Sequence, residues 1–295
     1  MGEVKAAVEK ALGFPLAVFR RLKGGSSPNF KAVRASDGFT FLVKLLPPER
    51  QWAYSILVAH LEEMAGTKAV RRVLSEVDER VGDFRLVCLE WCEGDTKMPH
   101  QLTDDELRRL FKFYQAFSAS LQTASHLFPP DPLEEWRRRI LACRALAVAP
   151  IRRLVEREIP SAEAAYRPDA LRVIFGDFHH GNLLFRDGEV HRVLDLESFA
   201  RGYPTDDLVR YFTCAYDHLK WKACFHRRAM LRSFATVLRA SPYSRREWMV
   251  SLNAALLRRL LGATERPRNP FAALNLLVRV KFYRDLKKVA SSVLQ

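Results

Sequence analysis

Three residues between positions 175 and 197 have side chains and spacing that suit phosphoryl transfer. The segment reads FGDFHHGNLLFRDGEVHRVLDLE, where Asp177 precedes Asn182 by five residues and Asp195 follows Asn182 by thirteen. Transfer from ATP to an alcohol needs a carboxylate that orients the attacking hydroxyl and accepts its proton. It also needs oxygen ligands that hold Mg²⁺ against the phosphates. The pattern therefore predicts an ATP-dependent kinase.

The same segment predicts the backbone that would position these side chains. A β-type run, LRVIF, precedes Asp177, and a second, NLLF, follows the loop. Asp187-Gly188 favours a tight turn, after which VHRVLDL returns to Asp195. We expect a loop followed by a β-hairpin, and this ordered set supports the prediction better than any single residue does.

The motif GDFHHGNLLF followed by VLDLE resembles the G-D-x-H-x-x-N…D-x-[DE] signature of the aminoglycoside phosphotransferase and choline kinase family, which phosphorylates small molecules. The resemblance implies that Asp177 is the catalytic base, Asn182 a Mg²⁺ ligand and Asp195 the principal Mg²⁺ ligand. His179 matches the loop histidine of the family. The chain departs at Phe175, where the family usually has His in a position that supports the loop from behind.

A glycine-rich turn near the N-terminus is the predicted phosphate-binding loop. Residues 16–23 (LAVFRRLK) alternate as a strand should, and Gly24, Gly25, Ser26 and Ser27 follow. Glycines let the backbone approach phosphates closely, while free N–H groups and hydroxyls donate to phosphate oxygens.

Lys44 lies within an otherwise apolar strand, FTFLVKLL, that follows the strand FKAVRA. Burying a lysine charge is costly without an anionic partner, and the α- and β-phosphates of ATP would supply one. A helix is expected from Pro47-Pro48 to about residue 65, and in this fold it would present a glutamate to Lys44. The sequence does not decide between the candidates, which are Glu49, Glu62 and Glu63.

Two further strands are expected at 70–77 and 84–91, joined by a turn at 80–83. The second ends in Glu90, Trp91 and Cys92, placed where the hinge of the family binds adenine through backbone groups. The expected fold is therefore α+β, two-lobed and protein-kinase-like. An ATP-binding lobe at 1–94 would hold a five-stranded antiparallel sheet and one helix, and a mainly helical lobe at 95–295 would carry catalysis and acceptor binding.

The hydrophobic period changes to that of helices after residue 95. Thr103 and Glu106 form a capping box that opens a helix with one apolar face: Leu107, Leu110, Phe111, Tyr114, Phe117 and Leu121. Further helices are expected at 132–148, at 150–158 and from 205 to the end. Asp207 best matches the family's helix-start Asp that hydrogen-bonds the catalytic loop, whereas capping alone would explain Asp206 equally well.

Positive charge is concentrated in residues 211–295. This segment has seventeen Lys or Arg residues and four acids, which gives +13 of the total charge of +14. Such a field favours a phosphorylated or carboxylated acceptor, or an anionic membrane surface, and argues against a cationic aminoglycoside. The alternative is that these charges are merely solvated helix faces. No recognition motif for nucleic acid accompanies them, which argues against that partner.

The remaining features point to a cytoplasmic small-molecule enzyme. The five cysteines lack C-x-x-C spacing, no apolar run is long enough to span a membrane, and the first residues lack a signal-peptide core. About a dozen residues separate Asp195 from Asp207, too few for the activation segment of protein kinases, so we expect a small-molecule or glycan acceptor.

A catalytically silent pseudokinase that binds a partner through its basic helices is the alternative. Pseudokinases commonly lack at least one catalytic residue, whereas Lys44, Asp177, Asn182 and Asp195 are all present here. The completeness of this set favours the active kinase.

Overall fold

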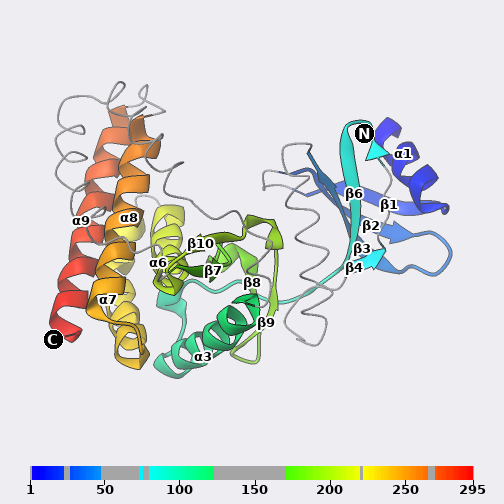
Figure 1. The fold of residues 1–295 in the computed structure, drawn as a ribbon. Coiled ribbons are helices and arrows are strands. Elements are labelled where there is room, and N and C mark those ends of the chain that lie inside the picture. The colour runs from blue at the N-terminus through cyan, green and yellow to red at the C-terminus, as the bar shows by residue number, and fades with distance from the viewer. Residues whose placement is uncertain are drawn as a thin grey trace. The chain divides into compact units, whose positions relative to one another are not determined.

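The computed structural model describes residues 2–22, 27–47, 73–75, 80–122, 171–219, 222–264 and 270–294. The chain forms two compact units, and each is considered by itself (Figure 1). The first contains Met1–Asp95 and His191–Glu197, and the second contains Thr96–Val190 and Ser198–Gln295. The first is built on a β-sheet and the second is mainly helical, so the predicted α+β fold class is confirmed.

The sheet of the first unit is antiparallel throughout, with strand order β1-β2-β3-β6-β4. Its strands are β1 (Leu16–Arg21), β2 (Asn29–Arg34), β3 (Thr40–Leu46), β4 (Val73–Ser75), β5 (Arg80–Val81) and β6 (Phe84–Glu90). It has six strands where the sequence predicted five, because the short β5 pairs with β6 across the turn expected at 80–83. Gly82 closes that turn with a φ of +62°, a value that glycine adopts without strain.

The core of the first unit lies between the sheet and a helix that the sequence analysis did not predict. Helix α1 (Gly2–Leu12) contributes Val8, which packs with Leu16, Phe30 and Phe41 from the strands. Its apolar residues recur at helical spacing, and this signal could have been found: Val4, Ala7, Val8, Ala11 and Leu12. The helix expected from 47 to 65 lies outside the described residues.

The second unit begins with α3 (Asp104–Leu121), and Thr103 and Glu106 form the predicted capping box in front of it. All six predicted apolar positions of α3 are buried. Two small sheets follow, β7 (Arg172–Ile174) with β10 (Ala200–Gly202) and the hairpin β8 (Leu183–Arg186) with β9 (Glu189–Val193), and the chain passes into the first unit within β9. The helices expected at 132–148 and 150–158 lie outside the described residues.

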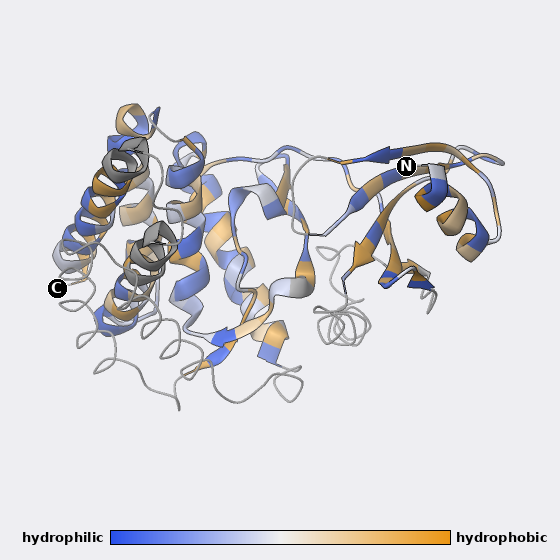
Figure 2. Cartoon of the chain, turned by 90° about the horizontal axis from the view of Figure 1, so that it is seen from above, coloured by the Kyte–Doolittle hydropathy of each residue, from blue (hydrophilic) through white to orange (hydrophobic). Residues whose placement is uncertain are grey.

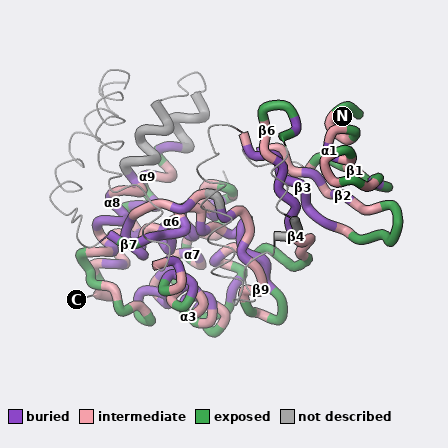
Figure 3. The backbone as a smooth tube through the Cα atoms, turned by 45° about the vertical axis from the view of Figure 1, so that its right-hand side comes forward, coloured by how far each residue is buried: buried purple, intermediate pink, exposed green. Residues whose placement is uncertain are grey.

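Four helices complete the second unit, namely α6 (Pro204–Leu219), α7 (Ala223–Ala240), α8 (Arg245–Thr264) and α9 (Pro270–Val293). Helix α6 contacts α7, α8 and α9, and ten of its sixteen residues are buried, so it is the core helix of this group (Figure 3). The helices carry both hydrophilic and hydrophobic bands, as amphipathic packing requires (Figure 2). Within the described part of the chain, no helix combines the length and apolarity needed to cross a bilayer.

Candidate active site

The loop that carries Asp177 leaves β7 through a turn that only glycine can make. Gly176 has a φ of +75°, and a Cβ there would lie 2.2 Å from the backbone oxygen of Ser198. Just before it, Phe175 is fully buried and meets Phe117 and Phe178 edge to face. Aromatic packing therefore supports the loop from behind, at the position where the resembling family usually has His.

Asp207, near the start of α6, fastens this loop. Its Oδ2 accepts a hydrogen bond from the amide of Phe175 and its Oδ1 one from the amide of Gly176, both at 2.8 Å. Asp206 instead accepts from the amide of Tyr203 at 3.0 Å, at the start of the same helix. The prediction that Asp207 is the loop-binding residue is confirmed, because the turn aims two adjacent amides at its carboxylate.

Tyr114 of α3 completes the support under Asp207. Its hydroxyl lies 3.1 Å from Asp207 Oδ2 and 2.7 Å from the backbone oxygen of Pro204, and it can donate to either. Complete burial raises the pKa of Asp207 to about 7, although the two amides and the phenol each oppose that rise.

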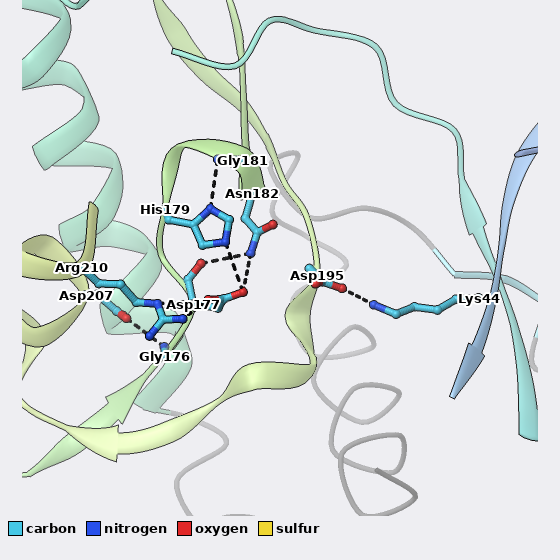
Figure 4. Close-up of polar contacts among 9 residues, drawn as sticks. All are labelled: Lys44, Gly176, Asp177, His179, Gly181, Asn182, Asp195, Asp207 and Arg210. Atoms are coloured by element: carbon cyan, nitrogen blue, oxygen red, sulfur yellow. Dashed lines mark hydrogen bonds and ion pairs between the residues drawn. The ribbon is translucent and has the colours of Figure 1, made fainter. Parts of the chain in front are cut away.

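Three side chains surround the carboxylate of Asp177 (Figure 4). Asn182 Nδ2 donates to Oδ2 at 2.8 Å, and His179 Nε2 lies 3.4 Å from the same oxygen. Arg210, from α6, donates to Oδ1 through Nε at 3.0 Å and through Nη2. Burial would raise the pKa of Asp177, but His179 and Arg210 outweigh it and lower the pKa to about 2. Asp177 is therefore ionised at neutral pH and held in one orientation.

The hydrogen bonds of His179 fix its tautomer in the neutral state. Its Nδ1 accepts from the amide of Gly181 at 3.0 Å, so the proton of the neutral ring is on Nε2, the nitrogen that faces Asp177. The loop histidine thus links the backbone of the loop to its carboxylate.

The first unit contains the other half of the predicted site. Lys44 on β3 is 3% exposed, and its Nζ forms an ion pair with Asp195 Oδ1 across 151 residues of sequence (Figure 4). Asp195 has a φ of +62°, an uncommon backbone state for a residue other than glycine that often marks functional positions. The structure thus pairs Lys44 with Asp195, whereas Glu49, Glu62 and Glu63 lie outside the described residues.

Part of the predicted phosphate-binding loop is described. Ser27 is 5% exposed, and its hydroxyl has no hydrogen-bond partner among the described residues. Asn29, two residues later, lies directly opposite Lys44 in the β2–β3 ladder. A buried hydroxyl without a partner in this position suits a donor to a phosphate oxygen. Gly24, Gly25 and Ser26 lie outside the described residues.

The predicted hinge residues follow the end of β6. Glu90 is the last residue of the strand and lies 3.8 Å from Arg192. Lys31 Nζ lies 4.6 Å from the ring centre of Trp91, and Cys92 Sγ lies 3.7 Å from the backbone oxygen of Glu90. None of these contacts tests adenine binding, so that assignment stays a prediction.

The candidate metal ligands have the chemistry that Mg²⁺ prefers. Asn182 uses its amide nitrogen on Asp177, which leaves its side-chain oxygen as a ligand atom, and Asp195 supplies a carboxylate. In the described ranges, no group of three or more His, Cys, Asp or Glu could hold a metal ion unaided. Mg²⁺ usually takes one or two protein carboxylates and completes its shell with substrate phosphates and water, so each of these two oxygen donors, taken in its own unit, suits it.

Two residues of the site, Arg210 and Tyr114, were not predicted from the sequence. Arg210 follows Asp207 by three positions, which places both on one face of α6 and could have identified it. Tyr114 was predicted only as part of an apolar face, although a buried phenol needs a hydrogen-bond partner.

The sequence profile described as the phosphotransferase enzyme family matches residues 18–262. No curated protein matches the chain. Similar solved structures include a microcompartment-associated aminopropanol kinase (13% identity, TM-score 0.63, covering 98% of this chain and 99% of the other). They also include the macrolide 2'-phosphotransferase MphH of Brachybacterium faecium (15% identity, TM-score 0.57, covering 96% and 98%). A mutant aminoglycoside phosphotransferase solved with AMP-PNP and hygromycin B is similar too (15% identity, TM-score 0.59, covering 97% and 99%). These likenesses confirm the predicted kinase-like fold.

Proposed function

The chain belongs to the phosphotransferase enzyme family, and we propose that it is a kinase that uses ATP and Mg²⁺ to phosphorylate a hydroxyl group of a small molecule or glycan. The observation that carries the proposal is that the Asp177 carboxylate is ionised and held in one orientation. Three donors hold its carboxylate ionised, on a loop that Asp207 and Gly176 fix in place. A carboxylate in this setting orients an alcohol and takes its proton.

The low pKa of Asp177 is compatible with this role. A carboxylate with a pKa of about 2 is a weak base. Phosphoryl transfer passes through a loose transition state, in which positioning and charge stabilisation contribute more than early proton removal. Asp177 would therefore act mainly by orienting the hydroxyl and would accept its proton late.

We assign nucleotide binding to the lobe at 1–94 together with Asp195. Lys44 would bind the α- and β-phosphates, Gly24, Gly25, Ser26 and Ser27 would donate to phosphate oxygens, and the backbone of Glu90, Trp91 and Cys92 would bind adenine. Asn182 and Asp195 would hold Mg²⁺, which neutralises charge on the β- and γ-phosphates when bound. The Lys44–Asp195 ion pair supports this assignment, because a cation and a metal-binding carboxylate are already adjacent.

The lobe at 95–295 would bind the acceptor, which we propose to be anionic or to lie at an anionic membrane surface. Two of the four acids after residue 210 are paired with arginines, Asp217 with Arg279 and Asp285 with Arg227. The described helices also carry exposed cations: Arg228, Arg232, Arg239, Arg245, Arg246, Lys281, Arg284 and Lys288. The resulting positive field favours anions.

A transfer screen with γ-labelled ATP and Mg²⁺ tests the proposed function. The acceptors would be sugars, sugar phosphates, amino alcohols, aminoglycosides and lipopolysaccharide-core fragments. Asp195→Asn should abolish Mg²⁺-dependent nucleotide binding, whereas Asp177→Asn should keep binding and lose transfer, because metal ligation acts on the ground state and the base acts on the reacting hydroxyl. Equal loss of nucleotide affinity in the two folded variants would contradict these roles. Nucleotide binding without transfer to any acceptor, and without slow ATP hydrolysis, would support the pseudokinase alternative instead.

A further inference from the structure

Arg210 is a cation bound directly to the proposed catalytic base. Its Nε and Nη2 donate to Asp177 Oδ1, whereas the side chains of Asn182 and His179 contact Asp177 Oδ2 (Figure 4). The side chain of Arg210 remains 38% exposed. Both bonds to Asp177 use Nε and Nη2, so the third guanidinium nitrogen, Nη1, is not used on Asp177. Arg210 therefore has donors available beyond those that hold Asp177.

The surroundings of Arg210 on α6 extend this polar surface. Arg210, Cys214 and His218 are spaced four residues apart, so they lie on one face of the helix. The ring of His218 lies 5.0 Å from that of His180 in the catalytic loop. His180 is 9% exposed, and its Nδ1 is buried without a hydrogen-bond partner among the described residues. The face of α6 next to the loop thus carries the Arg210 guanidinium, and the loop beside it holds a buried imidazole nitrogen without a partner among the described residues.

The position of Arg210 restricts what can surround the reacting hydroxyl. An acceptor hydroxyl must come within about 3 Å of the Asp177 carboxylate. Groups a few bonds from that hydroxyl therefore lie beside the guanidinium, which repels an ammonium group and attracts an acid group. A guanidinium also matches the oxygen geometry of carboxylates and phosphates better than a point charge does.

We propose that Arg210 is the specificity residue for the acceptor and binds a carboxylate or phosphate group that the acceptor carries close to the hydroxyl to be phosphorylated. The inference rests on the proposed kinase function and narrows its acceptor class to hydroxy acids and phosphorylated alcohols. It does not depend on the basic helices after residue 220, because Arg210 touches Asp177 itself.

Matched acceptor pairs test this inference. The pairs are glycerol with glycerol 3-phosphate, and glucose with glucose 6-phosphate and with glucuronate, so that phosphate and carboxylate are compared. In the unmodified protein, kcat/KM for the anionic partner of at least one pair should be at least about tenfold higher than kcat/KM for the neutral partner. Arg210→Gln also removes a donor that holds Asp177, so kcat should fall for both partners of a pair, but kcat/KM for the anionic partner should fall at least about tenfold further, which removes the preference. Arg210→Lys should keep part of the preference for the anionic partner, because lysine retains the positive charge but lacks the planar guanidinium donors.

The controls separate charge, folding and catalysis. Arg108→Gln removes one exposed positive charge from α3, which lies outside the basic helices, and should alter kcat/KM for neither acceptor of a pair. Cooperative thermal unfolding should show that Arg210→Gln is folded, and its affinity for Mg²⁺-AMP-PNP should be unchanged. An equal fall in kcat/KM for anionic and neutral acceptors would show that Arg210 only positions Asp177, and it would overturn the inference. A preference for the neutral acceptor in every pair would also overturn it.

A binding measurement distinguishes failure of this inference from failure of the proposed function. Calorimetry with protein saturated in Mg²⁺-AMP-PNP would follow binding of glycerol 3-phosphate, glucose 6-phosphate and glucuronate. We expect at least one anion to bind at least about tenfold more tightly to the unmodified protein than to Arg210→Gln. If no acceptor is phosphorylated but this difference holds, the kinase proposal fails and the anion site stands. If the anions bind both proteins equally, the anion site is refuted.

Discussion

Replacing Asp207 with Asn tests how the catalytic loop is held. Both oxygens of Asp207 accept amide hydrogen bonds of 2.8 Å, from Phe175 and Gly176, and the residue is fully buried. An asparagine keeps one acceptor oxygen and turns an NH₂ group toward the other amide. The substitution therefore leaves a buried donor unsatisfied and places two donors face to face.

The expected loss of stability follows from these bonds. A buried donor left without a partner costs about 1–3 kcal/mol, and a hydrogen bond to a charged group contributes about 1.5–3 kcal/mol. Since one oxygen remains, we expect Asp207→Asn to lower the free energy of unfolding by about 2–4 kcal/mol. The measurement belongs near pH 8, above the raised pKa of about 7, so that the native side chain is a carboxylate.

The assay is urea unfolding followed by circular dichroism, together with phosphate transfer at saturating ATP. The urea midpoint should fall with an unchanged slope. The kcat should fall at least about tenfold, because the two amides directly precede Asp177 in the loop, while Mg²⁺-nucleotide affinity changes little. Asp206→Asn is the matched control, since its amide oxygen can still accept from Tyr203, and it should cost less than about 1 kcal/mol. A loss for Asp207→Asn no larger than for Asp206→Asn would refute the reasoning.

Three further predictions concern the loop turn, acid stability and charge. Gly176→Ala should lower thermal stability far more than Gly38→Ala. Both glycines have φ above +70°, but of the two only Gly176 would place a Cβ against backbone atoms. A similar loss of thermal stability in both variants would contradict this prediction. The hydrogen bond from Lys97 lowers the pKa of Glu106 to about 2, below its usual 4.5, so its stabilisation is present above about pH 4.5 and is lost as pH falls toward 2. Lys97→Met should flatten that decline in urea midpoints, and an unchanged acid profile would show that the pair contributes nothing. Raising salt from about 50 to 300 mM should weaken acceptor binding more than nucleotide binding, because the shorter Debye length screens long-range attraction. If acceptor affinity does not change with salt, the basic helices are only solvated surface.

Local pattern was enough to predict much of the fold. The Asp187-Gly188 turn, with φ of +53° and +75°, lies where the sequence placed it, and β8 and β9 flank it as expected. The capping box of Thr103 and Glu106 and the apolar face of α3 are also as predicted. Helix α1 and strand β5 were not predicted. The apolar residues of α1 do recur at helical spacing, so this helix could have been predicted, whereas a two-residue strand such as β5 is too short to show a period.

The sequence by itself determined the residue types that could do the chemistry and the local elements that carry them. Turn residues, caps and hydrophobic periods act over a few positions, so they can be read along the chain. Only the tertiary structure decided which distant side chains meet. Lys44 pairs with Asp195, and Asp177 is held by Arg210, because packing of the strands and of α6 brings these charges together. Burying a charge is favourable only beside a partner, and the identity of that partner depends on the folded arrangement, which no local pattern records.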